Sequence, residues 1–565
     1  MKQLIVYVIG IGGILVLFLF PSSGGRRELL KTGEEAVMKE QFLDAYSVYA
    51  NKSPIEIELK DQTKGNWLFK EEEQGEPFVD TDGVLLYPVE QLEGLLHTSV
   101  ILYPDGTLLI EQGKKEIQYE KEEIRWKKNV PYISLSQITK DLSYQIQWNR
   151  GTNQVEILGN PDHALPAKFD LREQQRVTKV RDQGKYGTCW AFGALGAMES
   201  VLLPEERLCL APDHMTKHSG FYLTEEEGGA YNMSIAYLAS WKGPVLEEDD
   251  PYGDGYSPKY LAPVKHLEEA VLLPSKDYEA IKRAVFLYGG VETNIFTSLK
   301  SASSWSQYYN QDTYAYYFNG NLKPNHDVVI VGWDDHYPKE NFTKTPEGDG
   351  AFICKNSWGT EFGEEGYFYI SYYDSVVGTN NVVYTKIESP DNFDNIYQTD
   401  ELGWVGQIGY DREDAWFSNV YTAKGDELLE AVSFYATMPD TSYEVYVVPH
   451  FYTEDSLQER RKVAEGAFEQ AGYYTVRLTE QISLTKGQKY AVVVKIHTKD
   501  AVQPVAIEYH KDIRTSTFTT SHGEGYISLY GVDWTRLETK QNSNVCLKAF
   551  TTNKKTLEEN RVDIQ

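Results

Sequence analysis

Three segments that lie far apart in the sequence carry side chains that together could break an amide bond. The first holds Cys189, which follows the chain-breaking residues Gly184 and Gly187 and precedes an apolar, helix-compatible run over residues 190–203. A cysteine at the point where a loop enters a helix lies beside unpaired backbone N–H groups, and these favour a thiolate anion. The sequence therefore predicts a reactive thiol at position 189.

The second and third segments supply an imidazole and a side-chain amide. His326 comes directly before the β-branched run 328–331, which predicts a buried strand with the histidine at its start. Asn356 follows another apolar strand and is followed by Ser357 and Trp358. An asparagine can accept a hydrogen bond from one imidazole nitrogen and so fix the ring. Trp358 could keep water away from that bond.

These segments resemble the papain family of cysteine peptidases. His326 lies 137 residues after Cys189, within the family spacing of about 130–150 residues. Asn356 lies 167 residues after Cys189 and exceeds that spacing, which an insertion over residues 337–350 would explain. The resemblance covers residues 165–388 and implies a fold of two lobes, one helical and one of β-strands. It implies that Cys189 is the nucleophile, His326 the general base and acid, and Asn356 the residue that orients His326.

The same resemblance assigns four further residues. It implies that the Gln183 amide and the Cys189 backbone N–H form the oxyanion hole. Gly228 and Gly229 would line the cleft with backbone that pairs with extended substrate, and Trp358 would border that site. No metal or cofactor is implied, and no Cys-x-x-Cys pair suggests a zinc site.

Two positions depart from the family pattern. Tyr186 replaces the first cysteine of the family's nucleophile motif, which removes a disulfide but not the catalytic group. Asp327 replaces the small residue that usually follows the histidine, and alternation along a strand predicts that it points away from His326, with no catalytic role. The three other cysteines, Cys209, Cys354 and Cys546, are predicted to be buried structural residues.

Length and charge restrict the function further. The chain has 565 residues, enough for three to five domains, and a formal net charge of −29, which disfavours nucleic-acid and anionic-membrane partners. Residues 4–20 are continuously apolar, so residues 1–24 predict a cleaved signal peptide or a retained membrane anchor, and a secreted or cell-surface protein. Residues 25–74 are polar and predict a linker.

The predicted fold is α+β and multidomain, with a small α/β module before the peptidase domain and an all-β sandwich after it. Residues 75–160 contain a hairpin signal at Asp105-Gly106 and a serine-capped helix from Ser134. They resemble the copper amine oxidase N-terminal module, which implies no copper. Residues 393–552 contain short alternating strands, interrupted by a helical pattern at 454–467, and resemble the lectin-like sandwich of certain bacterial cysteine peptidases. Residues 553–565 form a polar tail.

Three functions fit these observations. The first is an exported endopeptidase that acts on proteins or peptides, with cell-wall glycan as a partner of the C-terminal domain. The second is a surface adhesion or wall-binding protein whose peptidase domain is mainly a scaffold. The third is a cell-wall amidase that uses a similar cysteine and histidine, although Gln183 and the sequence Asn-Ser-Trp after residue 355 favour the peptidase.

Overall fold

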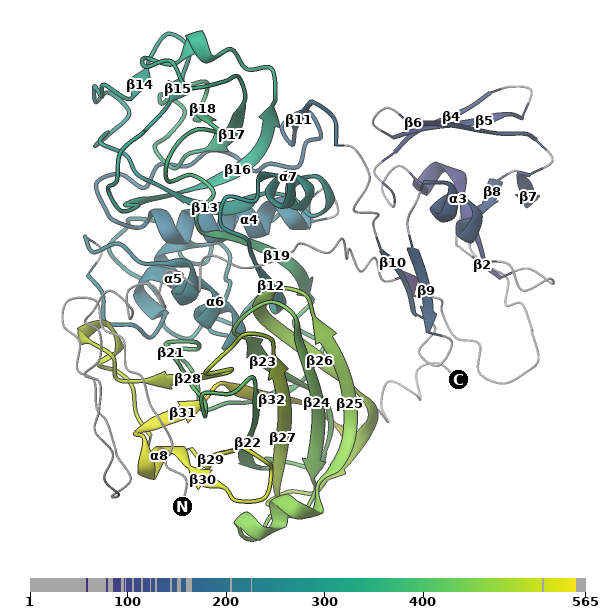
Figure 1. Cartoon of the computed structure of the whole chain (residues 1–565), viewed down its shortest axis with the longest axis vertical. Coiled ribbons are helices and arrows are strands. Elements are labelled where there is room, and N and C mark those ends of the chain that lie inside the picture. The colour runs from purple at the N-terminus through teal and green to yellow at the C-terminus, as the bar shows by residue number, and fades with distance from the viewer. Residues whose placement is uncertain are drawn as a thin grey trace, which may run out of the picture. The chain divides into compact units, whose positions relative to one another are not determined.

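The computed structural model describes residues 165–554 except 204–205, 225 and 521–522, and short stretches between residues 57 and 158. Its contacts divide the described chain into two compact units, one within residues 50–169 and one from Asp170 onward (Figure 1). The predicted signal or anchor segment and most of the predicted linker lie outside the described residues. Among the described residues, no helix is both long and apolar enough to cross a membrane.

The first unit combines small antiparallel sheets with one helix. Helix α3 (Leu135–Asp141) begins after Ser134, whose hydroxyl accepts a hydrogen bond from the Gln137 N–H, as its sequence predicted. Gly106 adopts a positive φ of 95° between two strands of the predicted hairpin. The strands of this unit are β1 (Ile57–Glu58), β2 (Phe78–Val79), β3 (Leu85–Pro88), β4 (Ser99–Leu102), β5 (Leu108–Gln112), β6 (Lys115–Tyr119), β7 (Arg125–Lys127), β8 (Val130–Ser134), β9 (Gln145–Asn149) and β10 (Gln154–Leu158).

A helical lobe begins the second unit. Its central helix, α4 (Cys189–Leu202), is buried along nearly its whole length and packs against strand β16 (His326–Asp334). Gly193 and Gly196 permit this close approach, because a Cβ at either position would lie only 3.4 Å from side-chain atoms of Asp327 or Val329. The other helices are α5 (Pro212–His218), α6 (Tyr231–Ala239) and α7 (Tyr278–Leu287).

A mostly antiparallel sheet of 13 strands runs from the β lobe into the C-terminal region. Strand β12 joins them, because it pairs with β19 on one side and with β26 on the other (Figure 1). Its strands in the peptidase region are β11 (Lys168–Asp170), β12 (His266–Leu273), β13 (Val291–Ile295), β14 (Tyr309–Asn310), β15 (Ala315–Tyr316), β16, β17 (Ala351–Lys355), β18 (Tyr367–Ser371) and β19 (Asn381–Glu388).

The C-terminal region is almost entirely β-structure, as predicted. The helix predicted at 454–467 is wrong, because only Glu454–Glu459 forms a short 3-10 helix. Arg461–Phe468 is strand β25. The remaining strands are β20 (Asn395–Tyr397), β21 (Gly406–Ile408), β22 (Asp414–Thr422), β23 (Glu427–Ala436), β24 (Thr441–Val448), β26 (Ala471–Leu484), β27 (Lys489–Thr498), β28 (Val505–Tyr509), β29 (Gly525–Ser528), β30 (Thr535–Arg536), β31 (Ser543–Val545) and β32 (Leu547–Asn553). The short helix α8 (Leu537–Lys540) precedes β31.

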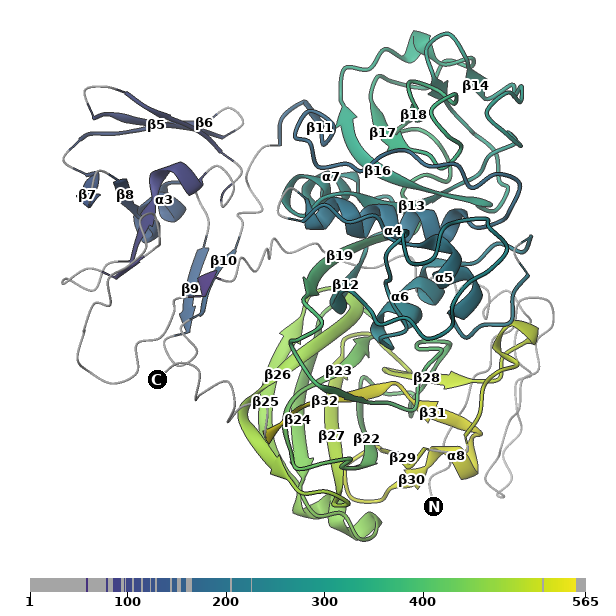
Figure 2. The ribbon, with the colours of Figure 1, turned by 180° about the vertical axis from the view of Figure 1, so that it is seen from behind.

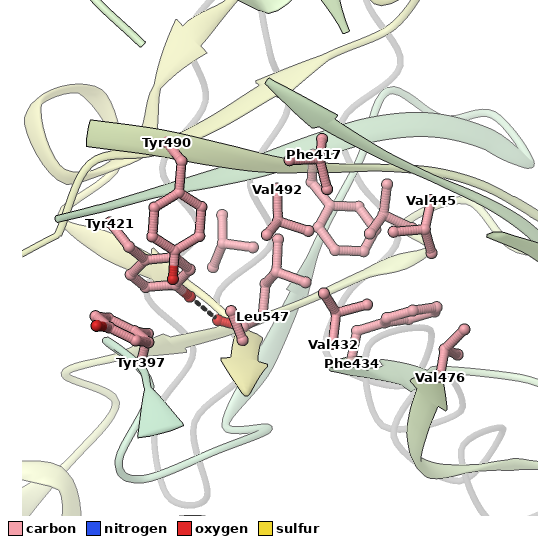
Figure 3. Close-up of a cluster of buried hydrophobic side chains, with 14 of the residues drawn as sticks. Tyr397, Phe417, Tyr421, Val432, Phe434, Val445, Val476, Tyr490, Val492 and Leu547 are labelled. Carbon is pink, nitrogen blue, oxygen red and sulfur yellow. Dashed lines mark hydrogen bonds between the residues drawn. The ribbon is translucent and has the colours of Figure 1, made fainter. Parts of the chain in front are cut away.

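Apolar side chains from facing sheets fill the centre of this region (Figure 3). Phe417 on β22 meets Phe434 on β23 edge to face, with ring centroids 6.0 Å apart. Tyr421 donates its hydroxyl hydrogen to the Leu547 carbonyl, so its polar end is satisfied inside the core. This two-sheet core agrees with the predicted sandwich. The helices α4, α5 and α6 lie between strands β14–β18 of the β lobe and this sandwich (Figure 2).

Candidate active site

Cys189 is the first residue of α4, and Thr188 stands at the N-cap position. The side chain is 6% exposed, so the thiol lies just beneath the surface. Burial is the largest influence on the Cys189 thiol and raises its pKa, and Asp327 raises it further. The backbone N–H groups of Asp327 and Trp190 act in the opposite direction. The helix start therefore favours the thiolate, as the sequence predicted, but its surroundings in this structure favour the thiol.

His326 and Asn356 lie side by side at the ends of neighbouring strands. The His326 Nε2 atom is 2.8 Å from the Asn356 Oδ1 atom, and β16 pairs directly with β17, which ends one residue before Asn356. Burial lowers the pKa of His326 to about 4, while the Asn356 hydrogen bond opposes this shift. The Trp358 ring stacks on His326 with a centroid distance of 4.7 Å. The imidazole is thus neutral, fixed at one nitrogen, and covered on one face.

Gln183 lies in the loop before the cysteine and is held by a network of hydrogen bonds. Its side-chain oxygen accepts from the Ser357 hydroxyl at 2.6 Å, and its Nε2 donates to the Tyr186 carbonyl at 2.7 Å. The Tyr252 hydroxyl lies 2.9 Å from the Gln183 carbonyl oxygen and 2.6 Å from the Thr188 hydroxyl. Since the Gln183 amide carries two N–H groups, one donor remains for another acceptor.

The sequence analysis assigned Tyr252 no role in the site. In the structure it connects the Gln183 loop to the start of α4 and packs edge to face on Phe192, with centroids 4.8 Å apart. Ser357 likewise joins Gln183 to the segment that holds Asn356. Their roles depend on contacts between distant segments, which a motif search cannot detect.

Asp327 lies closer to the nucleophile than its prediction implied. Although it follows His326 on β16, its Oδ2 atom lies 3.8 Å from the Cys189 sulfur, and the Cys189 thiol donates to it. The other carboxylate oxygen accepts from the Asn294 amide on β13, which pairs directly with Asp327. Alternation does place successive side chains on opposite faces. However, α4 packs across β16, so the face that carries Asp327 also meets the helix start.

Gly228 and Gly229 lie against the loop and helix that carry Cys189. A Cβ on Gly229 would lie 2.5 Å from the Trp190 ring, so only glycine fits there without a shift. A Cβ added to Gly228 would lie 3.9 Å from the Gly187 carbonyl oxygen. A pocket beside the first turn of α4 is lined by Thr188, Trp190, Leu223, Thr224 and Glu227. The two glycines therefore lie against the segment that carries the Cys189 thiol.

The remaining cysteines are free and only partly match their prediction. Cys354 and Cys546 are buried, whereas Cys209 is exposed, which corrects the expectation for that residue. Cys209 lies in the connection between α4 and α5, where its backbone carbonyl accepts a hydrogen bond from the Glu247 N–H. Within the described part of the chain, no group of three or more histidine, cysteine, aspartate or glutamate residues could hold a metal ion.

Comparison with known protein families identifies two domains in this chain. Residues 165–387 match the papain family cysteine protease model, and residues 396–551 match the lectin like domain model. Curated relatives include a viral cathepsin of Choristoneura fumiferana defective polyhedrosis virus, 29% identical over 254 residues, which cover 44% of this chain and 72% of the relative. Cathepsin K of Gallus gallus is 31% identical over 217 residues, covering 36% of this chain and 58% of the relative.

Cysteine proteinase 15A of Pisum sativum is 30% identical over 250 residues, covering 41% of this chain and 65% of that protein. The chain thus spans less than two thirds of the length of two of these three relatives. Among solved structures, the cysteine protease and lectin-like domains of Cwp84, a surface layer associated protein of Clostridium difficile, align with a TM-score of 0.60 and 28% identity. They cover 69% of this chain and 90% of that chain.

Fold, site and comparisons agree on the class of protein. Residues 165–387 form a papain family cysteine protease domain, so the chain carries a cysteine-type peptidase domain. More particularly, that domain is followed by a lectin-like domain, the arrangement also seen in Cwp84.

Proposed function

We propose that this protein hydrolyses peptide bonds of protein substrates outside the cytoplasm, through a thioester formed on Cys189. One observation carries the proposal. The His326 ring is bonded to Asn356 at 2.8 Å on a strand whose next residue touches the Cys189 sulfur. A buried, neutral imidazole on the residue before Asp327 can take the proton of the helix-start thiol when substrate binds, which is the task of a general base.

The reaction would proceed in two stages. His326 takes the proton of Cys189, and the sulfur attacks the scissile carbonyl carbon to give a tetrahedral oxyanion. The Cys189 backbone N–H and the second N–H of Gln183 donate to that oxyanion. His326 then gives its proton to the leaving amine, and a thioester remains on Cys189. Water, deprotonated by His326, attacks the thioester and regenerates the thiol. Asn356 holds the ring in place throughout.

The test is a pair of single substitutions. We expect Cys189→Ala to abolish hydrolysis of casein or a fluorogenic peptide, because alanine has no nucleophile. Cys209→Ala is the matched control and should leave the rate unchanged, since the exposed Cys209 lies outside the site. Hydrolysis that continues in Cys189→Ala would refute the thioester mechanism. Release of cell-wall fragments instead of casein peptides would indicate amidase activity.

Carbohydrate binding by the lectin-like domain is a second proposed activity, and one cleft favours it. The cleft has a volume of about 910 Å³ and is bordered by both domains of the second unit. The lectin-like domain contributes Gln398 and Asn544 to this lining, and the peptidase domain contributes Lys259 and the Tyr260 ring, which is 89% exposed. Lys242 and Glu401, in the same lining, form an ion pair with each other. Sugar hydroxyls donate and accept hydrogen bonds, and sugar C–H faces pack on aromatic rings.

This cleft can be tested with purified cell-wall polysaccharide. We expect the full chain to sediment with the polysaccharide, and Tyr260→Ala to weaken binding without a change in casein hydrolysis. Equal binding by wild type and Tyr260→Ala would contradict this use of the cleft. If binding were present and peptide hydrolysis absent, the chain would be mainly an adhesion protein, the alternative that its relatives do not favour.

A surface location is proposed on two grounds. The apolar N-terminal run predicts export, and the structurally similar Cwp84 is described as surface layer associated. Immunodetection in culture supernatant and cell-wall fractions, with N-terminal sequencing, would show whether the first 24 residues are removed.

A further inference from the structure

Asp327 occupies an unusual place for an acidic residue. It is 6% exposed, and its Oδ2 atom lies 3.8 Å from the Cys189 sulfur. Its other oxygen is bonded to the Asn294 amide, which fixes the carboxyl group. The sequence analysis gave this residue no role, and the mechanism above does not use it. A carboxyl group held this close to a nucleophilic sulfur must change the energy of the thiolate.

The groups around Asp327 include a second buried carboxyl group. On β13, Glu292 is 1% exposed and accepts a hydrogen bond from the Tyr384 hydroxyl on β19 at 2.9 Å. A Cβ on Gly193 of α4 would lie 3.4 Å from the Asp327 side chain and 3.5 Å from that of Glu292. The two carboxyl groups therefore lie beneath the same turn of the nucleophile helix, and each disfavours ionisation of the other.

Cations do not neutralise this pair. Lys179, Arg181 and Lys355 line a small cavity that Asp327 also borders. Arg181 is paired with Glu199 and Glu247, and Lys355 donates to a threonine hydroxyl. On Asp327's own strand, His326 is the neutral imidazole bonded to Asn356. Within the described chain, no cation forms an ion pair with Asp327.

We propose that Asp327 is a positioning residue that switches the Cys189 sulfur between thiolate and thiol. When the Asp327 carboxyl group is neutral, it donates its O–H to the thiolate, while His326 holds the proton taken from sulfur. When Asp327 loses its proton to solvent, the carboxylate repels the thiolate. The proton on His326 then returns to sulfur, and the thiol donates to the carboxylate. One proton leaves the site in this change, and the inference rests on the proposed role of Cys189.

The pH at which this change occurs follows from the surroundings. Burial raises the pKa of Asp327 to about 7, although its hydrogen bonds from Asn294 and Cys189 lower it. Burial and the neighbouring Asp327 likewise raise the pKa of Glu292 well above its ordinary value. Protonation of Asp327 below about pH 7 therefore removes one charge that disfavours the thiolate, and ionisation of Asp327 above about pH 7 suppresses the thiolate further. An ordinary thiol shows the opposite trend, because its thiolate fraction rises with pH.

The experiment measures the rate of Cys189 alkylation by iodoacetamide, a neutral reagent, between pH 5 and pH 9. It uses the full chain with Cys209→Ser, because that exposed thiol would also react. We expect the rate constant to decline above about pH 7. Asp327→Asn removes the charge but keeps a donor, and should abolish the decline, with alkylation about tenfold faster than the parent at pH 8.5. Asp327→Ala should also abolish it.

Asp334→Asn, at the far end of the same strand, is the matched control and should keep the decline. Thermal unfolding would confirm that each variant is folded. If alkylation of the parent protein became faster with each increase in pH, the inference would be overturned. It would also be overturned if the pH profiles of alkylation for Asp327→Asn and Asp327→Ala matched that of the parent. Neither result would affect the test of Cys189→Ala, so failure of the switch and failure of the proposed function are distinguishable.

Discussion

The seam between α4 and β16 and the core of the lectin-like domain are both buried, but they are made of different residues. The seam buries the polar side chains of Gln183, His326, Asp327 and Asn356. The lectin-like core is almost entirely valine, leucine, isoleucine and aromatic. Apolar burial stabilises a fold directly, whereas a buried polar group costs free energy unless it is bonded. The polar side chains of the seam therefore stabilise the fold less than apolar side chains would, whereas the side chains of the lectin-like core stabilise it directly.

The lectin-like domain is not free of buried charge, which sharpens the contrast. Lys548 and Asp400 are each 1% exposed and form an ion pair at 2.8 Å. Glu508, 3% exposed, accepts a hydrogen bond from the Leu402 N–H at 2.7 Å. These groups lie near the boundary with the peptidase domain, and Glu508 lines the cleft between the domains. Of these three buried charged residues, only Glu508 lines a proposed ligand site.

The largest expected effect is in the seam. His326→Ala removes the proposed base, and we expect kcat/KM for a fluorogenic peptide to fall by about 10²–10⁴-fold. The unfolding temperature should hardly change, because the ring is bonded only to Asn356 and stacked on one tryptophan. If His326→Ala instead lowered the unfolding temperature strongly and kept the specific activity of the parent, the contrast between seam and core would be reversed.

The opposite pattern is expected for Phe417, which is 2% exposed in the lectin-like core. Phe417→Ala should lower the free energy of unfolding by about 3–5 kcal/mol, since it leaves a cavity between the sheets. Peptide hydrolysis by the folded variant should be unchanged. Urea unfolding measures the loss, and Tyr452→Ala is the control, because Tyr452 is 81% exposed. Equal losses in both variants would contradict the packing described here.

The stability of the lectin-like domain should depend on Glu508. Burial raises the pKa of Glu508 to about 8, against about 4.3 in an unfolded chain. The folded state therefore binds more protons between these values, and stability falls as pH rises from 5 to 8. We expect a loss of about 3–4 kcal/mol that Glu508→Gln removes. Urea unfolding at pH 5 and pH 8 measures it, with the exposed Glu459→Gln as control. A slope unchanged in Glu508→Gln would exclude this carboxyl group as its source.

The smallest effect is expected at Ser357, whose hydroxyl donates to the Gln183 side chain. Ser357→Ala should cost about 1 kcal/mol of stability and lower kcat/KM by less than tenfold, because Gln183 keeps its bond to Tyr186. Ser442→Ala, at an exposed position in the lectin-like domain, is the control. A loss in kcat/KM as large as that of His326→Ala would mean that Ser357 acts directly on the substrate.

Much of this organisation follows from the sequence, because it depends on local pattern. The loop before Cys189, the strand after His326 and the strands of the C-terminal region all follow from residue type and periodicity. The helical pattern at 454–467 misled because its middle forms an edge strand, where pairing with β24 outweighs local preference. The contact of Asp327 with sulfur depends on how α4 crosses β16, and neither segment alone specifies that crossing. The resemblance of residues 75–160 to the amine oxidase module remains a prediction.

The most direct test of the account is to capture the covalent intermediate. The full chain would be mixed with a peptidyl nitrophenyl ester, quenched in acid within milliseconds, and digested for mass spectrometry. We predict one acyl group per molecule, attached to the peptide that contains Cys189 and absent from Cys189→Ala. An acyl group found on Cys209 instead, or rapid turnover with no adduct at Cys189 and full activity in Cys189→Ala, would contradict the account.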